Sequence, residues 1–206
     1  MSSKIEICNL ALGFLGEAPI ADMDAQTPAA QFCKLYFGPA LSELLREHPW
    51  NFATAREKLT PLEAPAAFAR EYKCAYAYPA LCLNLHFLID EHGQKDRDFM
   101  LAFDVSRTII LSNLADAVAA FTRYVDDSTR FDPAFSMAFA RKMQCMLVKP
   151  LLKNNPSLVK EAEELFRQAL EAARLQDVRE SRQFQGDGRL WNGGHDLWAD
   201  SVTKVF

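Results

Sequence analysis

A helical pattern stops abruptly at His48-Pro49, and two aromatic residues follow it within three positions. Proline disfavours the helical conformation in the residue before it, so a helix should end at His48. Trp50 and Phe52 lie two apart, the spacing at which side chains of an extended segment share one face. Each ring can bury roughly 150–250 Å2 of surface. We therefore predict that this junction anchors a helical layer to the structure that follows. It consists of His48, Pro49, Trp50, Asn51 and Phe52.

Bulk composition narrows the class of protein. The chain has 206 residues, half of them hydrophobic, which suits one domain or one domain with a modest insertion. The net charge of −4 argues against a protein that grips nucleic acid through its phosphates. We expect no membrane span and no signal peptide, because the apolar runs fall well short of ~20 residues.

The cysteines predict a reduced protein. There are five, an odd number, and no two of them form a CxxC pair. We expect them to be mostly buried thiols and not a disulfide framework. They are Cys8, Cys33, Cys74, Cys82 and Cys145.

Periodic apolar patterns predict helices at both ends of a central segment. The first covers residues 5–15 and the second residues 28–48, which Gly38-Pro39 should kink or split in two. Asp132-Pro133 and Asn155-Pro156 each place a capping residue before a proline, and this pattern opens a third and a fourth helix.

The central segment is predicted to be rich in strands. Prolines exclude a long helix there, and tyrosines and a cysteine alternate between residues 72 and 78. Residues 83–89, 99–103 and 108–111 are further predicted strands. The composition of residues 114–124 is compatible with either a helix or a strand.

Together these patterns predict a mainly α (α+β) fold, a helical bundle of about four long helices with a β-rich insertion and an extended C-terminal arm. We assign residues 1–53 to the first half of the bundle and 54–130 to the insertion. Residues 131–182 form its second half, and 183–206 a flexible arm.

The arm combines glycines with large apolar side chains. Four glycines between positions 186 and 194 disfavour a helix, yet the segment is too apolar for an inert linker. We predict that it docks on a partner; folding back across its own helices is the alternative. The predicted docking residues are Phe184, Leu190, Trp191, Leu197, Trp198 and Phe206.

The sequence contains no recognised catalytic motif. A phosphate-binding glycine loop, a GxSxG elbow and an HExxH pair are all missing from it. His86 and His92 lack a third ligand at metal spacing, so we predict neither a metal nor a cofactor. Acid pairs such as Asp22 with Asp24, or Asp126 with Asp127, leave a carboxylate-pair peptidoglycan hydrolase as the alternative function.

An ordered series of segments carries a family resemblance. It begins with Ala11-Leu12-Gly13-Phe14-Leu15-Gly16-Glu17 and passes through residues 44–53, 72–83 and 124–135. The Pro-Trp-Asn-Phe-Ala run at residues 49–53 is its most specific part. In this series the chain resembles the tail tubular protein A family, the head-to-tail adaptors (connectors) of short-tailed bacteriophages and prophages, over roughly residues 5–180. It departs from the family at Ala29-Ala30-Gln31, where an arginine is usual.

The resemblance implies a non-enzymatic structural protein of the virion. Its partners would be the portal protein, the tail nozzle protein and further copies of itself in a ring, most often a dodecamer. DNA would pass through the ring during ejection without sequence-specific binding, and no membrane is involved. The implied location is the tail or neck of the virion, and the host cytoplasm during assembly.

Overall fold

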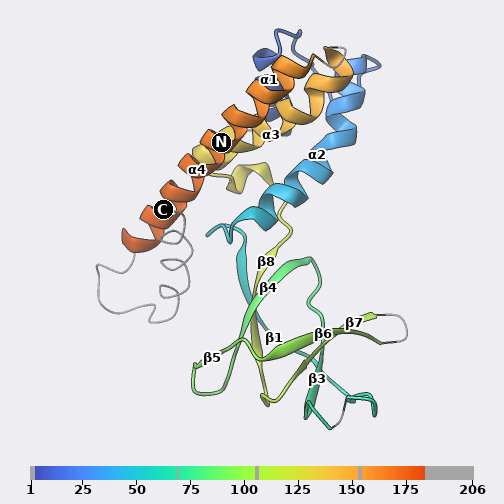
Figure 1. Ribbon diagram of the computed structural model, residues 1–206, viewed down its shortest axis with the longest axis vertical. Coiled ribbons are helices and arrows are strands. Elements are labelled where there is room, and N and C mark those ends of the chain that lie inside the picture. Colours follow the sequence, from blue (N-terminus) through green and yellow to red (C-terminus); the bar gives the residue numbers. More distant parts are fainter. Residues whose placement is uncertain (1–2, 69, 105–106, 153–154, 184–206) are drawn as a thin grey trace.

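The structure, a computed structural model, describes residues 3–68, 70–104, 107–152 and 155–183. Within these residues it contains four α-helices and eight β-strands. Figure 1 shows an elongated molecule, with the helices gathered at one end and the strands at the other. The helices are α1 (Lys4–Phe14), α2 (Pro28–Glu47), α3 (Pro133–Leu151) and α4 (Pro156–Gln183).

Local capping fixes where the helices begin. Ser3 Oγ accepts a hydrogen bond from the Glu6 amide at 3.1 Å, and the Glu6 carboxylate accepts one from the Ser3 amide. Thr27 and Asp132 cap α2 and α3 by accepting hydrogen bonds from first-turn amides through their side chains, each before a proline in the first turn. The predicted starts of α2, α3 and α4 are therefore confirmed. Gly38-Pro39 was predicted to kink or split α2, and the split does not occur, because one helix with Pro39 inside it runs from residue 28 to residue 47.

Helix α3 lies at the centre of the helical layer and packs against α1, α2 and α4. Its buried side chains include Phe135 and Phe139, both fully covered. The same apolar cluster takes in Trp50 and Phe131, which lie outside the helices. The helical layer thus has its own core, and the chain entering and leaving the strands contributes to it.

The strands form two antiparallel sheets. The first has the order β1-β8-β4-β5 and the second β2-β3-β7-β6. The first is built from β1 (Thr54–Lys58), β8 (Val118–Arg123), β4 (Cys82–Ile89) and β5 (Lys95–Asp96). The second is built from β2 (Pro61–Leu62), β3 (Cys74–Ala77), β7 (Arg107–Ser112) and β6 (Phe99–Asp104). The segment 114–124 therefore contributes a strand, β8.

The two sheets share an apolar cluster. Leu88 and Phe121 reach it from the first sheet, and Tyr76 and Ile110 from the second. The opposite face of the second sheet carries Ala75, Ile109 and Leu111 and is covered by apolar side chains of the segment 62–72. Alternate residues of β3 and β7 thus enter different clusters, as the pleat of a strand requires.

The predicted fold class is wrong. The chain adopts an α+β fold with four helices and two four-stranded antiparallel sheets, and not a bundle of long helices with an insertion. The physical reason is that the strands bury apolar clusters of their own, while α1 has only eleven residues. The helices consequently make one part of the molecule, and the sheets form the other.

The predicted arm begins at the last residue of α4, and its remaining residues, 184–206, lie outside the part of the chain that the structure describes. No helix within the described part is long and apolar enough to cross a membrane.

Candidate functional site

The junction between α2 and β1 is a tight turn. Helix α2 ends at Glu47, and His48 has extended backbone angles. The amides of Ala53 and Thr54 both donate to the Trp50 carbonyl, at 3.0 and 2.9 Å. The Thr54 hydroxyl donates to the same carbonyl at 2.9 Å. Trp50 and Phe52 therefore do not begin an extended segment, because residues 51–53 form a hydrogen-bonded turn and β1 begins only at Thr54.

The two aromatic rings of the junction nevertheless pack inward as predicted. Trp50 is fully buried and meets the Phe135 ring edge-on, with their centroids 4.9 Å apart. Phe52 is half-buried and contacts the same ring at 4.8 Å. The Trp50 indole donates its N–H to the Leu44 carbonyl at 3.0 Å. That bond satisfies a carbonyl in the last turn of α2 while the ring anchors the turn to α3.

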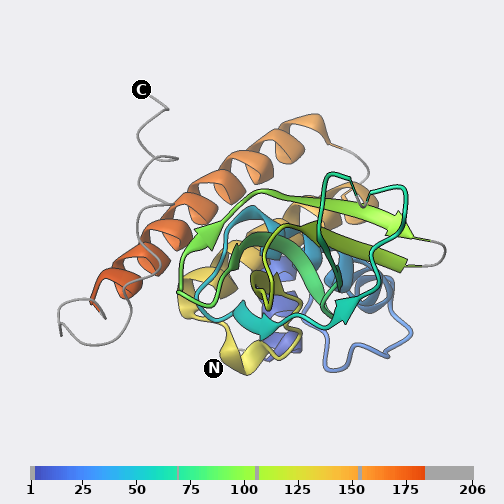
Figure 2. The same ribbon diagram turned by 90° about the horizontal axis from the view of Figure 1, so that it is seen from below.

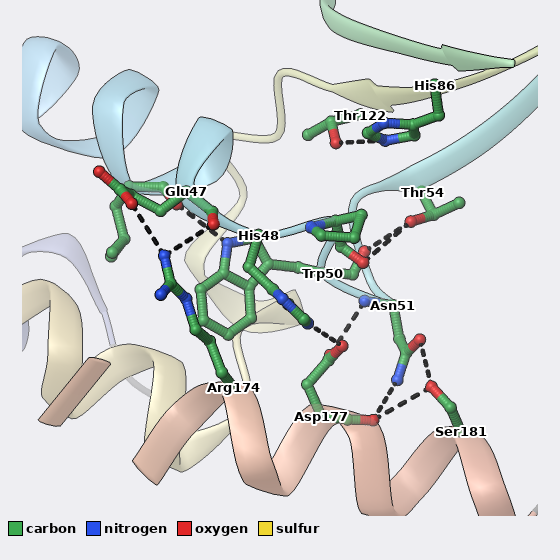
Figure 3. A network of polar contacts seen from close by, with 12 residues as sticks. Glu47, His48, Trp50, Asn51, Thr54, His86, Thr122, Arg174, Asp177 and Ser181 are labelled. Atoms are coloured by element: carbon green, nitrogen blue, oxygen red, sulfur yellow. Dashed lines mark hydrogen bonds and ion pairs between the residues drawn. The ribbon is translucent and has the colours of Figure 1, made fainter. Parts of the chain in front are cut away.

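A buried carboxylate on α4 holds the junction from the other side (Figure 3). Asp177 is only 4% exposed. One of its oxygens accepts from the Asn51 amide at 2.9 Å, and the other lies 3.0 Å from His48 Nε2. The backbone carbonyl of Asp177 accepts from the Asn51 side-chain amide at 2.8 Å, and Ser181 Oγ donates to Asn51 Oδ1 at 2.7 Å. The junction is thus bound to α4 through both its backbone and its side chains.

One turn earlier on α4, an arginine binds the end of α2. Arg174 donates to the Glu47 carbonyl and to the Glu47 carboxylate, both at 2.8 Å. A cation is favourable there, since the carbonyls at a helix C-terminus carry partial negative charge. Arg174 and Asp177 lie three apart on α4, so one stretch of that helix holds both α2 and the junction.

On the side of the sheets, a histidine faces the junction (Figure 3). The register of β4 against β8 shifts between Leu85 and Phe87, and an irregularity of this kind re-aims a side chain. His86 Nε2 lies 2.9 Å from the Thr122 hydroxyl. Burial, with smaller effects of the Arg97 and His48 charges, lowers the pKa of His86 to about 4. The His86 imidazole is therefore neutral near pH 7.

Sequence reasoning identified the junction but missed its partners on α4. Neither Arg174 nor Asp177 is among the residues that the sequence predicted for a site. A signal did exist. Asp177 follows the buried Ala173 by four positions, so it continues the apolar stripe of α4. An acid on a buried helical face requires hydrogen-bond donors opposite it, and the junction supplies them.

The acids considered for hydrolysis have other roles in the structure. Asp22 Oδ1 accepts from the Asp24 amide in a turn, and Asp126 pairs with Lys4 at 2.8 Å. Asp127 caps a short 3-10 helix, and its hydrogen bonds to Thr129 lower its pKa. A lowered pKa does not suit a general acid.

Over the described ranges, no three His, Cys, Asp or Glu side chains are grouped to hold a metal ion. All five cysteines are free thiols, of which Cys8 and Cys33 are buried and the other three half-buried. The junction holds the end of α2 and the start of β1 against α3 and α4.

Comparison of the chain with protein-family models gives no match, and comparison with curated proteins gives none either.

Proposed function

We propose that this protein is a head-to-tail adaptor of a phage or prophage, which forms a ring between the portal protein and the tail nozzle protein. The observation that carries the proposal is the two-ended molecule of Figure 1. Helices occupy one end and antiparallel sheets the other, so a ring of such protomers has two unlike faces. An adaptor requires this property because it must bind different partners above and below.

The junction supports the same role. Each protomer of a ring must hold its two ends at the same angle, or the ring cannot close. The Asp177 carboxylate, the Arg174 guanidinium and the packed Trp50 ring hold the chain that enters β1 against the helices, which would keep that angle the same in each protomer. The most specific part of the family resemblance, residues 49–53, coincides with this rigid element.

The negative net charge of the chain is compatible with DNA that slides through the ring. A net charge of −4 provides no overall attraction for phosphates, and DNA ejected through the ring must slide without being held. The mechanism is accordingly structural: the ring widens the contact surface of the portal, retains the packaged DNA and presents a symmetric platform to the nozzle. No reaction is involved.

Binding to the portal protein of the same genome tests the proposal. The purified adaptor and portal are mixed, separated by size exclusion and weighed by light scattering, and the complex is imaged by electron microscopy. We expect a stoichiometric ring of adaptor subunits on one face of the portal. An adaptor that never co-elutes with the portal, at low or at physiological salt, would overturn the function.

A further inference from the structure

Three of the four sheet edges within the described residues are protected against pairing with another chain. Strand β2 has only two residues and begins with Pro61, which cannot donate a backbone hydrogen bond. Strand β5 consists of Lys95 and Asp96 alone. Strand β1 has five residues and carries the charges of Arg56, Glu57 and Lys58. Short length, proline and charge are the usual means by which sheets prevent unwanted strand addition.

The fourth edge, β6, has none of these protections. It is six residues long, with the sequence Phe-Met-Leu-Ala-Phe-Asp, and its only charge is at the end. It pairs with β7 on one side and forms the edge of the sheet on the other. Since neighbouring residues of an antiparallel strand bond to opposite sides, about half of its backbone groups point away from β7.

The side chains of β6 leave an apolar surface beside that edge. Phe103 is 73% exposed and Leu101 is 47% exposed, and the two share a face because they lie two apart. Met100 and Ala102 point to the other face and pack against the cluster of Ala75, Ile109 and Leu111. An edge with free backbone groups and exposed apolar side chains is suited to accept an added strand.

We propose that β6 accepts the C-terminal segment of a neighbouring copy, residues 201–206, as an added strand. The segment is Ser-Val-Thr-Lys-Val-Phe, in which Val, Thr and Phe are residues that favour strands. Its six residues match the length of β6. Its one charge, Lys204, is opposite in sign to Asp98 and Asp104, the acids that flank the apolar part of β6.

The donor is a neighbouring copy for two reasons. In both views of the molecule, α4 ends on the opposite side from the place where β6 ends and β7 begins (Figures 1 and 2). The seventeen residues between Gln183 and Ser201 can span about 60 Å when extended, so the segment is not confined to its own protomer. A strand given by each copy to the next is a head-to-tail contact, the type from which closed rings are built.

This inference rests on the proposed function only for the closure of the ring; self-association can be measured without a portal. The experiment uses the full chain and follows its mass by light scattering over a concentration series up to about 1 mM, the range of weak specific binding. Phe103→Lys places a charge on the β6 edge, and Val205→Pro prevents the segment from pairing. Leu175→Lys, at a 54% exposed leucine of α4, is the matched control.

We expect the natural chain and Leu175→Lys to associate, and each of the other two variants to need at least a tenfold higher concentration. An equimolar mixture of Phe103→Lys and Val205→Pro should form a 1:1 dimer and nothing larger, because only one intact edge and one intact segment remain. Equal melting temperatures would show that Phe103→Lys is folded. The amides of β6 should exchange more slowly in the natural chain than in Val205→Pro.

Several results would overturn the inference. They are a natural chain that stays monomeric throughout the series, a Val205→Pro variant that associates normally, and a mixture that does not dimerise. Normal association of Val205→Pro would instead indicate pairing of β6 with β6. A ring that still forms on the portal with Val205→Pro refutes the strand exchange alone, whereas failure of the natural chain to bind the portal refutes the function.

Discussion

Replacing Asp177 by alanine tests whether the junction is held as the structure indicates. The change removes the acceptor of the Asn51 amide at 2.9 Å and the partner of His48 Nε2 at 3.0 Å. Asp177 is nearly buried, so water cannot fully replace the carboxylate. A buried polar group left without its partner costs about 1–3 kcal/mol.

Two such groups lose their acceptor, and both are only partly buried, so we expect a loss of about 2–4 kcal/mol in the free energy of unfolding. For a chain of this size the melting temperature should fall by about 5–15 °C. Chemical denaturation followed by circular dichroism measures the loss, with the slope on denaturant unchanged. Asp177→Asn retains one acceptor for the Asn51 amide and should lose less than Asp177→Ala.

Glu171→Ala is the matched control, because Glu171 is an exposed acid on the same helix. It should change stability by no more than about 0.5 kcal/mol. If Asp177→Ala is as mild as this control, the carboxylate does not hold the junction. The angle between helices and sheets would then depend on Trp50 and Phe52 alone.

Three further predictions concern pH, the arm and enzymatic activity. The pKa of His86 is about 4 when folded and about 6.5 when unfolded, so between these values the unfolded chain binds a proton that the folded chain does not. The free energy of unfolding should therefore be unaffected by His86 above about pH 6.5 and should fall by about 2 kcal/mol, a value reduced for the partial exposure of the ring, as the pH drops to about 4. His86→Gln should remove this loss of stability. His92→Gln, at an exposed histidine, should not remove it. Deleting residues 184–206 should leave the melting temperature within a few degrees but abolish binding to the portal, and binding that persists would place docking elsewhere. The purified chain should not clear peptidoglycan; clearing that disappears on replacing Asp126 or Asp22 would instead support the hydrolase.

Much of the secondary structure was accessible from local patterns. Asp132 accepts from the amides of Ala134 and Phe135, as its place before Pro133 predicts. The predicted strand at residues 83–89 lies within β4. The turn that follows β4 carries Gly93 with φ of 79°, where glycine is unstrained. Caps, turns and alternation depend on residues a few positions apart, so the sequence shows them directly.

The candidate site was accessible only in part. The aromatic junction stood out because proline and two large rings mark it locally. Its acceptor, Asp177, lies 126 positions after Asn51 along the chain, and sequence spacing says nothing about a contact of that range. The sequence does place an acid, Asp177, on the apolar stripe of α4. Its position shows that the carboxylate needs a hydrogen-bond donor as partner, but not which residue supplies it.

The sequence by itself therefore determined where α2, α3 and α4 begin and which residues are apolar enough to be buried. The tertiary structure decided that residues 51–53 form a turn, that the strands bury clusters of their own, and that β6 is left at an unprotected edge. The physical reason is range. Backbone preferences and caps act within one or two turns of chain, whereas burial and strand order depend on contacts between segments far apart in sequence.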